Sequence, residues 1–449
     1  MLLCTLLATA AGAAESFPVP AAIAPNVAFW EKVYGHYSIN ETVLHDRQEL
    51  GIIYGTIEME GAEVPGAGER NRQRVQAEIL RIGSILRGLA DGATPSTPGE
   101  RKVAALFAKR SPAQLRQAAD NIRAQGGLRE RFQQGVRRSG AYIKEFRQMF
   151  IAAGLPQELA YLPHVESSFD PEARSKAGAV GLWQFTHDTG RRYLTVNHLV
   201  DERLDPWRSS QAAARYLKES RDALGDWPLA LTSYNYGRAG MVRAKQALGS
   251  YERIFAEYNG GHFKFAARNF YSEFVAALRV ARRLEADPAV ARDRPRSSTS
   301  RELTQGLTIT EAAQRYGVSR DSLLVHNPAL LTPVVSGQRA IPQGYVLRLP
   351  ATVSGTAVAA AGVAKSPGSS PQALHPPQER RGGEQKMVRY QVRQGDTVSS
   401  IARRHKIAAE MLIAANKLNR EATIQVGQYL TIPSGTATQD DRTVHLERR

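Results

Sequence analysis

The segment from Ala351 to Lys386 most constrains how this 449-residue chain can fold. It is rich in Ala, Gly, Ser and Pro and contains no Phe, Tyr or Trp. A segment of this kind cannot bury enough apolar surface to offset the entropy that ordering it would cost. We therefore expect a flexible tether at residues 351–386, with separately folded parts before and after it. The chain is also longer than the chains that ordinarily fold around one hydrophobic core.

Hydrophobic patterning indicates helices over most of the chain before residue 287. Two later segments instead share the order apolar strand, two short helices, apolar strand ending in Pro, which indicates a divergent repeat. The predicted organisation is a helical N-terminal extension without assigned chemistry (15–127), a helical domain (128–286), a charged linker (287–301), two small modules (302–350 and 387–434) and a polar tail (435–449). The predicted fold class is mainly α, with two βααβ modules.

The first residues resemble a secretory signal. Leucines dominate the first seven positions, and the small residues Ala10–Ala14 resemble a cleavage site, although the usual preceding basic residues are missing. We expect a signal peptide at 1–14, which would carry away Cys4, the only cysteine. The mature chain could then form no disulfide, thiolate metal site or thiol nucleophile. We predict an exported protein of the periplasm or cell envelope with no metal or cofactor, and leave membrane anchoring open.

The formal net charge of +16 favours a polyanionic partner without choosing one. Nucleic acid, anionic membrane and cell-wall polymer all carry suitable charge, and a basic surface can also simply aid solubility. The sequence has no zinc-finger spacing, Walker loop or recognisable nucleic-acid motif, so we predict no nucleic-acid partner. No later segment is long and apolar enough to span a bilayer.

Glu166 is the candidate catalytic residue. It follows an apolar helical face formed by residues such as Leu162 and Val165. A carboxyl group against such a face loses hydration, so its pKa should rise towards the working pH. A protonated carboxylic acid in a groove can protonate the leaving oxygen of a glycosidic bond.

Other residues of the same region offer sugar-binding groups. Gly181 permits a close approach of the chain, while Trp183 and Gln184 offer a stacking face and an amide donor. Tyr234 and Asn235 add a phenol and an amide at the end of another helix. Each residue alone has an ordinary structural explanation, such as a core tryptophan or a capping asparagine. Their order along the chain is what favours a functional site.

The strings ES, GLWQ and YN, at Glu166, Gly181 and Tyr234, resemble the catalytic domain of the lytic transglycosylases. The resemblance covers roughly residues 129–283 and implies a lysozyme-like α-helical fold. It implies that Glu166 protonates the oxygen between N-acetylmuramic acid and N-acetylglucosamine. The same residue would then accept the proton of the 6-hydroxyl, which closes a 1,6-anhydro ring. Since no water is consumed, a second carboxylate is not required, and Asp170 and Glu172 are interpreted as structural.

The resemblance also implies roles for neighbouring residues. Ser167 would steady the site, Trp183 and Gln184 would line sugar subsites, and Tyr234 with Asn235 would face the glutamate. Trp183 stands where many relatives have methionine, and the later family tyrosine has only a candidate equivalent in ARNFYSEF. The implied substrate-binding set is Ser167, Gly181, Trp183, Gln184, Tyr234, Asn235 and Tyr271.

The segment RYQVRQGDTVSSIARRHKIAAEMLIAANKLNREATIQVGQYLTIP resembles a LysM module, which binds glycans containing N-acetylglucosamine. The resemblance implies glycan-binding loops that contain Gly395, Asp396, Thr397, Asn416, Leu418 and Asn419. The earlier module at 302–350 keeps Ile309, Ala312 and Asn327 at similar places but has Gly306-Leu307-Thr308 in place of the GDT turn. It resembles a degenerate LysM, either a sugar binder or a packed spacer.

Together these features predict a peptidoglycan lytic transglycosylase that LysM targets to the cell wall. One alternative is a hydrolytic, goose-type lysozyme-like muramidase, which shares the fold and the glutamate but adds water. Another is a non-catalytic protein that binds peptidoglycan through a lysozyme-like scaffold. The predicted partner is the glycan strand of peptidoglycan. Association with the outer membrane stays open, and the sequence is silent on oligomeric state.

Overall fold

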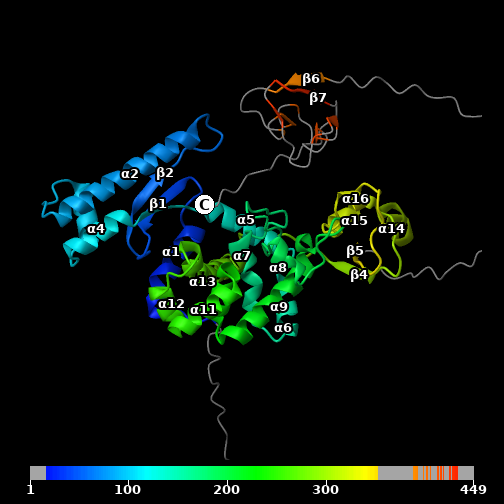
Figure 1. Cartoon of the computed structure of the whole chain (residues 1–449), viewed down its shortest axis with the longest axis horizontal. Coiled ribbons are helices and arrows are strands. Elements are labelled where there is room, and N and C mark those ends of the chain that lie inside the picture. Colours follow the sequence, from blue (N-terminus) through cyan, green and yellow to red (C-terminus); the bar gives the residue numbers. More distant parts are fainter. Residues whose placement is uncertain are drawn as a thin grey trace, which may run out of the picture. The chain divides into compact units, whose positions relative to one another are not determined.

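The computed structural model describes residues 17–351 and, in the C-terminal module, residues 388–392, 398, 401–402, 405, 412–413, 415–416, 418, 424–425 and 427–432. The chain divides into two compact units, Met1–Gly355 and Thr356–Arg449. Helices predominate (Figure 1), which confirms the mainly-α prediction. The predicted signal at 1–14, the tether after residue 351 and the tail at 435–449 lie outside the described residues. None of the helices that the structure describes has the length and apolar character needed to cross a membrane.

The N-terminal part contains a sheet that the sequence interpretation missed. Its antiparallel strand order is β2-β1-β3, and the apolar residues Leu44, Tyr54 and Ile122 pack against helix α2 and its neighbours. The elements are η1 (Ala21–Ile23), α1 (Ala24–Gly35), β1 (Glu41–Asp46), β2 (Ile53–Glu58), α2 (Ala67–Ala90), α3 (Pro98–Ala105), α4 (Pro112–Asp120) and β3 (Ile122–Gly126). Strand β3 lies in a segment that we predicted to be helical. It is a strand because it pairs with β1, which lies much earlier in the chain.

The helical domain is built around α13, whose middle is buried on almost every side. Its elements are α5 (Arg129–Ser139), α6 (Ile143–Ala152), η2 (Gln157–Tyr161), α7 (Pro163–Glu166), α8 (His187–Arg191), η3 (Glu202–Leu204), α9 (Pro206–Leu224), α10 (Trp227–Tyr236), α11 (Arg238–Leu248), α12 (Tyr251–Glu257) and α13 (Phe265–Ala286). Helix α1 packs along α13, and Asn26 Nδ2 donates to Asn269 Oδ1 over 2.7 Å. The core of this domain therefore includes residues that precede the predicted boundary at 128.

The first small module has the predicted βααβ plan, with one short extra helix. Its elements are β4 (Ser298–Glu302), α14 (Ile309–Tyr316), α15 (Arg320–His326), α16 (Thr332–Val335) and β5 (Val346–Pro350). Strands β4 and β5 pair antiparallel, from Ser298 opposite Pro350 to Glu302 opposite Val346. The last residues of the predicted linker at 287–301 therefore form the first strand of this module.

The C-terminal module repeats the outer strands, β6 (Val388–Gln391) and β7 (Tyr429–Ile432), as an antiparallel pair. Asn416 Nδ2 donates to the carbonyls of Leu412 and Thr431, each over 2.8 Å. Its Oδ1 accepts the Thr431 N–H over 2.6 Å. In the first module Asn327 makes the same three bonds, to the Leu323 and Arg348 carbonyls and from the Arg348 N–H. This shared clamp between helix and last strand supports the interpretation of a repeat.

Candidate active site

Glu166 is the last residue of α7, a short helix that begins at Pro163. Leu162 and Val165 are buried, whereas Glu166 is partly exposed. The apolar wall expected from the residue spacing is therefore present, and the carboxyl group still reaches the surface. Proline at the first helical position costs no hydrogen bond and starts the helix where the preceding 3-10 turn ends.

The chain leaves α7 through a strained turn held by its surroundings. Ser168 and Phe169 have φ values of 52° and 54°, in the left-handed region that non-glycine residues rarely adopt. Arg138 of α5 donates to both of their carbonyls, over 2.6 Å to Ser168 and 3.2 Å to Phe169. These bonds offset part of the strain and fix the direction in which α7 ends.

Ser167 connects Glu166 to the loop that contains GLWQ. Its side chain is buried, and Oγ lies 2.9 Å from the Leu182 carbonyl and 3.2 Å from the Pro163 carbonyl. Since the hydroxyl has one proton, it donates to one of these carbonyls at a time. The bond to Leu182 ties the end of α7 to the GLWQ loop, whereas the bond to Pro163 stays within α7, and the steadying role of Ser167 stays a prediction.

Gly181 is required by both conformation and space. Its φ is +75°, and a Cβ atom here would lie 2.3 Å from the Arg203 carbonyl oxygen. The close approach predicted for Gly181 is therefore present. Gln184 also has a positive φ, 49°, and its Nε2 donates to the Gly181 carbonyl over 2.9 Å and to the Ala173 carbonyl over 3.2 Å. The Gln184 side chain therefore bonds to the backbone of the loop that contains it.

Trp183 is a core residue, which corrects the expectation that its ring offers a sugar-stacking face. The side chain is 0% exposed and packs near Phe146 and Phe150, with ring centroids 6.1 and 5.7 Å away. Its Nε1 donates to Ser210 Oγ of α9 over 2.7 Å. The ring is therefore enclosed by the protein core. The backbone carbonyl of Trp183 accepts a hydrogen bond from Tyr234.

Tyr234 connects the YN string to the GLWQ loop. Its hydroxyl donates to the Trp183 carbonyl over 2.8 Å. Burial raises the pKa of Tyr234 well above its ordinary value, and the charge of Glu166 raises it further. The phenol therefore stays protonated, and the expectation that Tyr234 faces Glu166 stays a prediction. Asn235, the next residue, is exposed on the same helix end.

Tyr271 lies elsewhere, in the middle of α13. It is 0% exposed, and its hydroxyl donates to the Pro18 carbonyl over 2.8 Å. Its ring contacts Tyr251 of α12, with centroids 5.4 Å apart. These contacts connect α13 to the N-terminal segment, so they give no support to a subsite role for Tyr271.

Two pockets lie in the same domain, and Arg192 and Tyr193 line both of them. The first has a volume of about 460 Å³ and begins at Tyr236 and Gly237, directly after Asn235. Its lining includes Thr189, Arg192, Tyr193, Tyr216, Tyr236, Gly237, Arg238, Arg243 and His262. The second, of about 570 Å³, is lined by residues that include Arg191, Arg192, Tyr193, Thr195, Glu202, Arg208, Gln211 and Arg215.

The site residues that we predicted from the sequence do not include the arginines that line these pockets. One signal was available in the string TGRRY, which contributes Arg191, Arg192 and Tyr193. Arg238 is paired, since Nη1 lies 2.7 Å from Glu219 Oε2. Across residues 17–351 and the described part of the C-terminal module, no group of three or more His, Cys, Asp or Glu side chains is arranged to hold a metal ion.

In the C-terminal module the predicted glycan-binding residues are described only in part. Gly395, Asp396, Thr397 and Asn419 lie outside the described residues. The amide of Asn416 is occupied by the clamp to β7, so its contacts are structural. Leu418 is partly buried against the module core.

Comparison with known proteins gives two domain matches and several relatives. Residues 148–265 match the model of the transglycosylase SLT domain, and residues 390–433 match that of the LysM domain. Membrane-bound lytic murein transglycosylase D of Escherichia coli K12 is 28% identical over 294 residues, which cover 64% of this chain and 62% of that protein. Membrane-bound lytic murein transglycosylase F 2 of Alkalilimnicola ehrlichii is 35% identical over 113 residues, 23% of this chain and 24% of that protein. The chain thus spans about three fifths of the length of the first relative.

Proposed function

We propose that this chain, which carries a transglycosylase SLT domain and a LysM domain, is a peptidoglycan lytic transglycosylase. Its substrate would be the β-1,4 bond between N-acetylmuramic acid and N-acetylglucosamine, and its product a 1,6-anhydromuramoyl end. The observation that carries the proposal is that two hydrogen bonds bring the three strings together at the GLWQ loop. Ser167, directly after Glu166, bonds the Leu182 carbonyl, and Tyr234 bonds the Trp183 carbonyl. The names of the relatives agree with this class of enzyme.

Glu166 would act first as an acid and then as a base. Its proton passes to the glycosidic oxygen as the bond to the anomeric carbon breaks, which releases the N-acetylglucosamine side as an alcohol. The carboxylate then accepts the proton of the muramoyl 6-hydroxyl, whose oxygen bonds to the anomeric carbon. The enzyme returns to its protonated form, and no water enters the balance.

The surrounding residues would hold Glu166 in place for both steps. Ser167 fixes the end of α7, and Tyr234 fixes the Trp183 carbonyl beside it. The Asp170 carboxylate accepts the Glu172 N–H over 3.0 Å, a local turn contact. This supports the structural interpretation of Asp170, in agreement with a reaction that needs one carboxylate.

The LysM domain would retain the enzyme on peptidoglycan. The protein would be exported and would act in the cell envelope. The arginines of the two pockets would add attraction for the carboxylates of peptide stems on the same polymer. Binding to sacculi should therefore weaken as salt rises.

Digestion of purified sacculi with the wild type and with Glu166→Gln tests the proposal. Mass spectrometry of the soluble products should show anhydromuramoyl ends with the wild type and almost no release with the variant. Sacculus pull-down should remain unchanged, because the substitution leaves the LysM domain intact. Glu172→Gln is the matched control, an exposed acid six positions away that should keep full activity.

Each alternative function has its own signature in this assay. Reducing muramic ends in place of anhydro ends would identify hydrolysis. Sacculus binding without release of products by the wild type would identify a non-catalytic wall-binding protein. Full activity of Glu166→Gln would refute the assignment of the acid.

A further inference from the structure

The first small module, β4 to β5, is joined to the helical domain by a continuous backbone contact. Val200 pairs antiparallel with Leu330. The Asp201 N–H donates to the Ala329 carbonyl over 2.8 Å, and the Leu331 N–H donates to the Leu199 carbonyl over 2.9 Å. Val200 is 2% exposed and belongs to the apolar core of the module. A loop of the helical domain therefore completes the core of the module.

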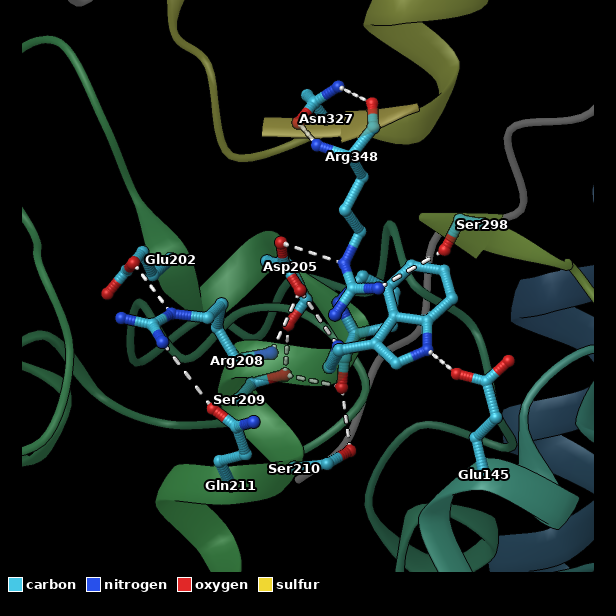
Figure 2. Close-up of polar contacts among 12 residues, drawn as sticks. Glu145, Glu202, Asp205, Arg208, Ser209, Ser210, Gln211, Ser298, Asn327 and Arg348 are labelled. Atoms are coloured by element: carbon cyan, nitrogen blue, oxygen red, sulfur yellow. Dashed lines mark hydrogen bonds and ion pairs between the residues drawn. The ribbon is translucent and has the colours of Figure 1, made fainter. Parts of the chain in front are cut away.

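Arg348 of β5 forms a second junction, buried and charged. Figure 2 shows its side chain reaching from the module towards Asp205. The guanidinium carbon lies 4.0 Å from the centroid of the Trp207 ring, and Nε lies 3.9 Å from Asp205 Oδ2. The side chains of Arg348 and Asp205 are only 12% and 2% exposed. Asn327 fixes Arg348 from behind by bonding both its N–H and its carbonyl.

Both partners of Arg348 stand at the first turn of α9. The Asp205 carboxylate accepts the N–H groups of Trp207 and Arg208, over 2.8 and 2.9 Å, and so caps the helix. The Trp207 Nε1 donates to Glu145 of α6 over 2.5 Å. Arg348 thus lies over a tryptophan whose N–H bonds an acid, so that the ring lies between two opposite charges.

Two connections lead to the loop 178–185, which Ser167 bonds at Leu182: one from α9 and one from the backbone contact at Asp201. In one, Ser210 of α9 accepts the Trp183 N–H, and the Trp183 carbonyl accepts Tyr234. In the other, Asp201, whose N–H is bonded by the module, pairs with Arg203 over 2.7 Å. Arg203 then donates to the Gly178 and Phe185 carbonyls, over 3.1 and 3.2 Å. The two connections hold both ends and the middle of residues 178–185.

We propose that the module 298–350 is a fixed part of the catalytic unit that positions the loop 178–185, with Arg348 as its positioning residue. The inference rests on the proposed function, because the loop matters through Glu166. It decides between the two roles left open for the degenerate module, in favour of structural support over independent sugar binding. The module shares Val200 in its core and buries Arg348 against the helical domain, so it packs as part of that domain.

Arg348→Met tests the inference on soluble glycan strands, with kcat and KM measured separately. The substitution keeps an unbranched side chain but removes the charge opposite Asp205. We expect kcat to fall about tenfold with KM within twofold of wild type, since the loop loses its alignment while the binding pockets stay intact. Arg339→Met, an exposed arginine of the same module, is the matched control and should behave as wild type.

Hydrogen exchange supplies a readout independent of catalysis. Amides of residues 178–185 should exchange faster in Arg348→Met, while those of α2 and α4 keep wild-type protection. If Arg348→Met does not fold, Arg348→Lys decides. It retains the charge but lacks the planar group that covers Trp207, so kcat should fall about threefold.

Three outcomes would overturn the inference. The first is a folded Arg348→Met with wild-type kcat and wild-type exchange at 178–185. The second is a raised KM with unchanged kcat, which would assign the module to sugar binding. The third is wild-type kcat for Arg348→Lys beside an unfolded Arg348→Met. An inactive wild type would instead refute the proposed function, and the exchange data would still test the positioning.

Discussion

Trp183→Phe separates a core role for this residue from a sugar-stacking role. The substitution removes the Nε1 donor that lies 2.7 Å from Ser210 Oγ and leaves a space beside Phe146 and Phe150. Loss of the hydrogen bond should cost about 1 kcal/mol. Ser210 still donates to the Pro206 carbonyl over 2.6 Å, so no buried hydroxyl proton is left without an acceptor.

The smaller ring adds a second cost to Trp183→Phe. The missing ring atoms and the cavity they leave should destabilise the helical unit by about 1–2 kcal/mol, since the site is fully enclosed. The total of about 2–3 kcal/mol corresponds to a fall in Tm of about 3–4 °C for a folded unit as large as residues 17–351. Because the ring does not reach the surface, KM on soluble glycan strands should stay within twofold of wild type.

The assay pairs thermal unfolding, followed by far-ultraviolet circular dichroism, with steady-state kinetics on the same samples. Tyr193→Phe is a useful comparison, because this tyrosine lines both pockets and is partly exposed. An unchanged Tm together with a severalfold rise in KM for Trp183→Phe would refute the placement of the ring in the core.

Three further predictions test the same framework. Gly181→Ala should lower both Tm and kcat, because its Cβ would lie 2.3 Å from the Arg203 carbonyl oxygen. Gly178→Ala, with a similar φ of +76° and open space around it, should lower the free energy of unfolding by only about 1–2 kcal/mol. Equal effects of the two substitutions would contradict this steric explanation. Burial, aided by the charge of Arg138, lowers the pKa of His164 from 6.5 to about 3, so the unfolded state binds the extra proton as pH falls below 6.5 and stability is lost. Between pH 6 and 4, denaturant unfolding should show wild type losing about 1.4 kcal/mol per pH unit more than His164→Phe, and parallel curves would count against this. Asn416→Ala breaks the clamp of the C-terminal module, so it should abolish sacculus pull-down and spare turnover on soluble strands. The matched Asn327→Ala breaks the clamp of the first module and should reduce turnover. The reverse pattern would exclude wall binding by the C-terminal module and structural support by the first.

The features predicted well from sequence were those determined by neighbouring residues. The apolar wall before Glu166 depends on helical spacing within a few positions, and the close approach at Gly181 on the lack of a side chain. The repeated βααβ modules likewise show their order of strands and helices in local patterns. For such features the sequence contains most of the physical information.

The features that were wrong depend on contacts between distant segments. Whether Trp183 faces solvent or core is decided by α6 and α9, which supply Phe146, Phe150 and Ser210. Strand β3 exists because β1 offers it a partner. No local pattern reports such partners, so residue type alone suggested a stacking ring and a helix.

The insertion of Val200 into the core of the module affects how this architecture can be recombined. Modules joined by a tether can be exchanged between genes as cassettes, but this one shares its core with the helical domain that precedes it. A gene fragment cut at Ala286 would separate Arg348 from Trp207 and strip the cover from Val200. The smallest gene fragment that keeps this junction intact therefore extends to Pro350, and substitutions on either side of the junction should be selected together.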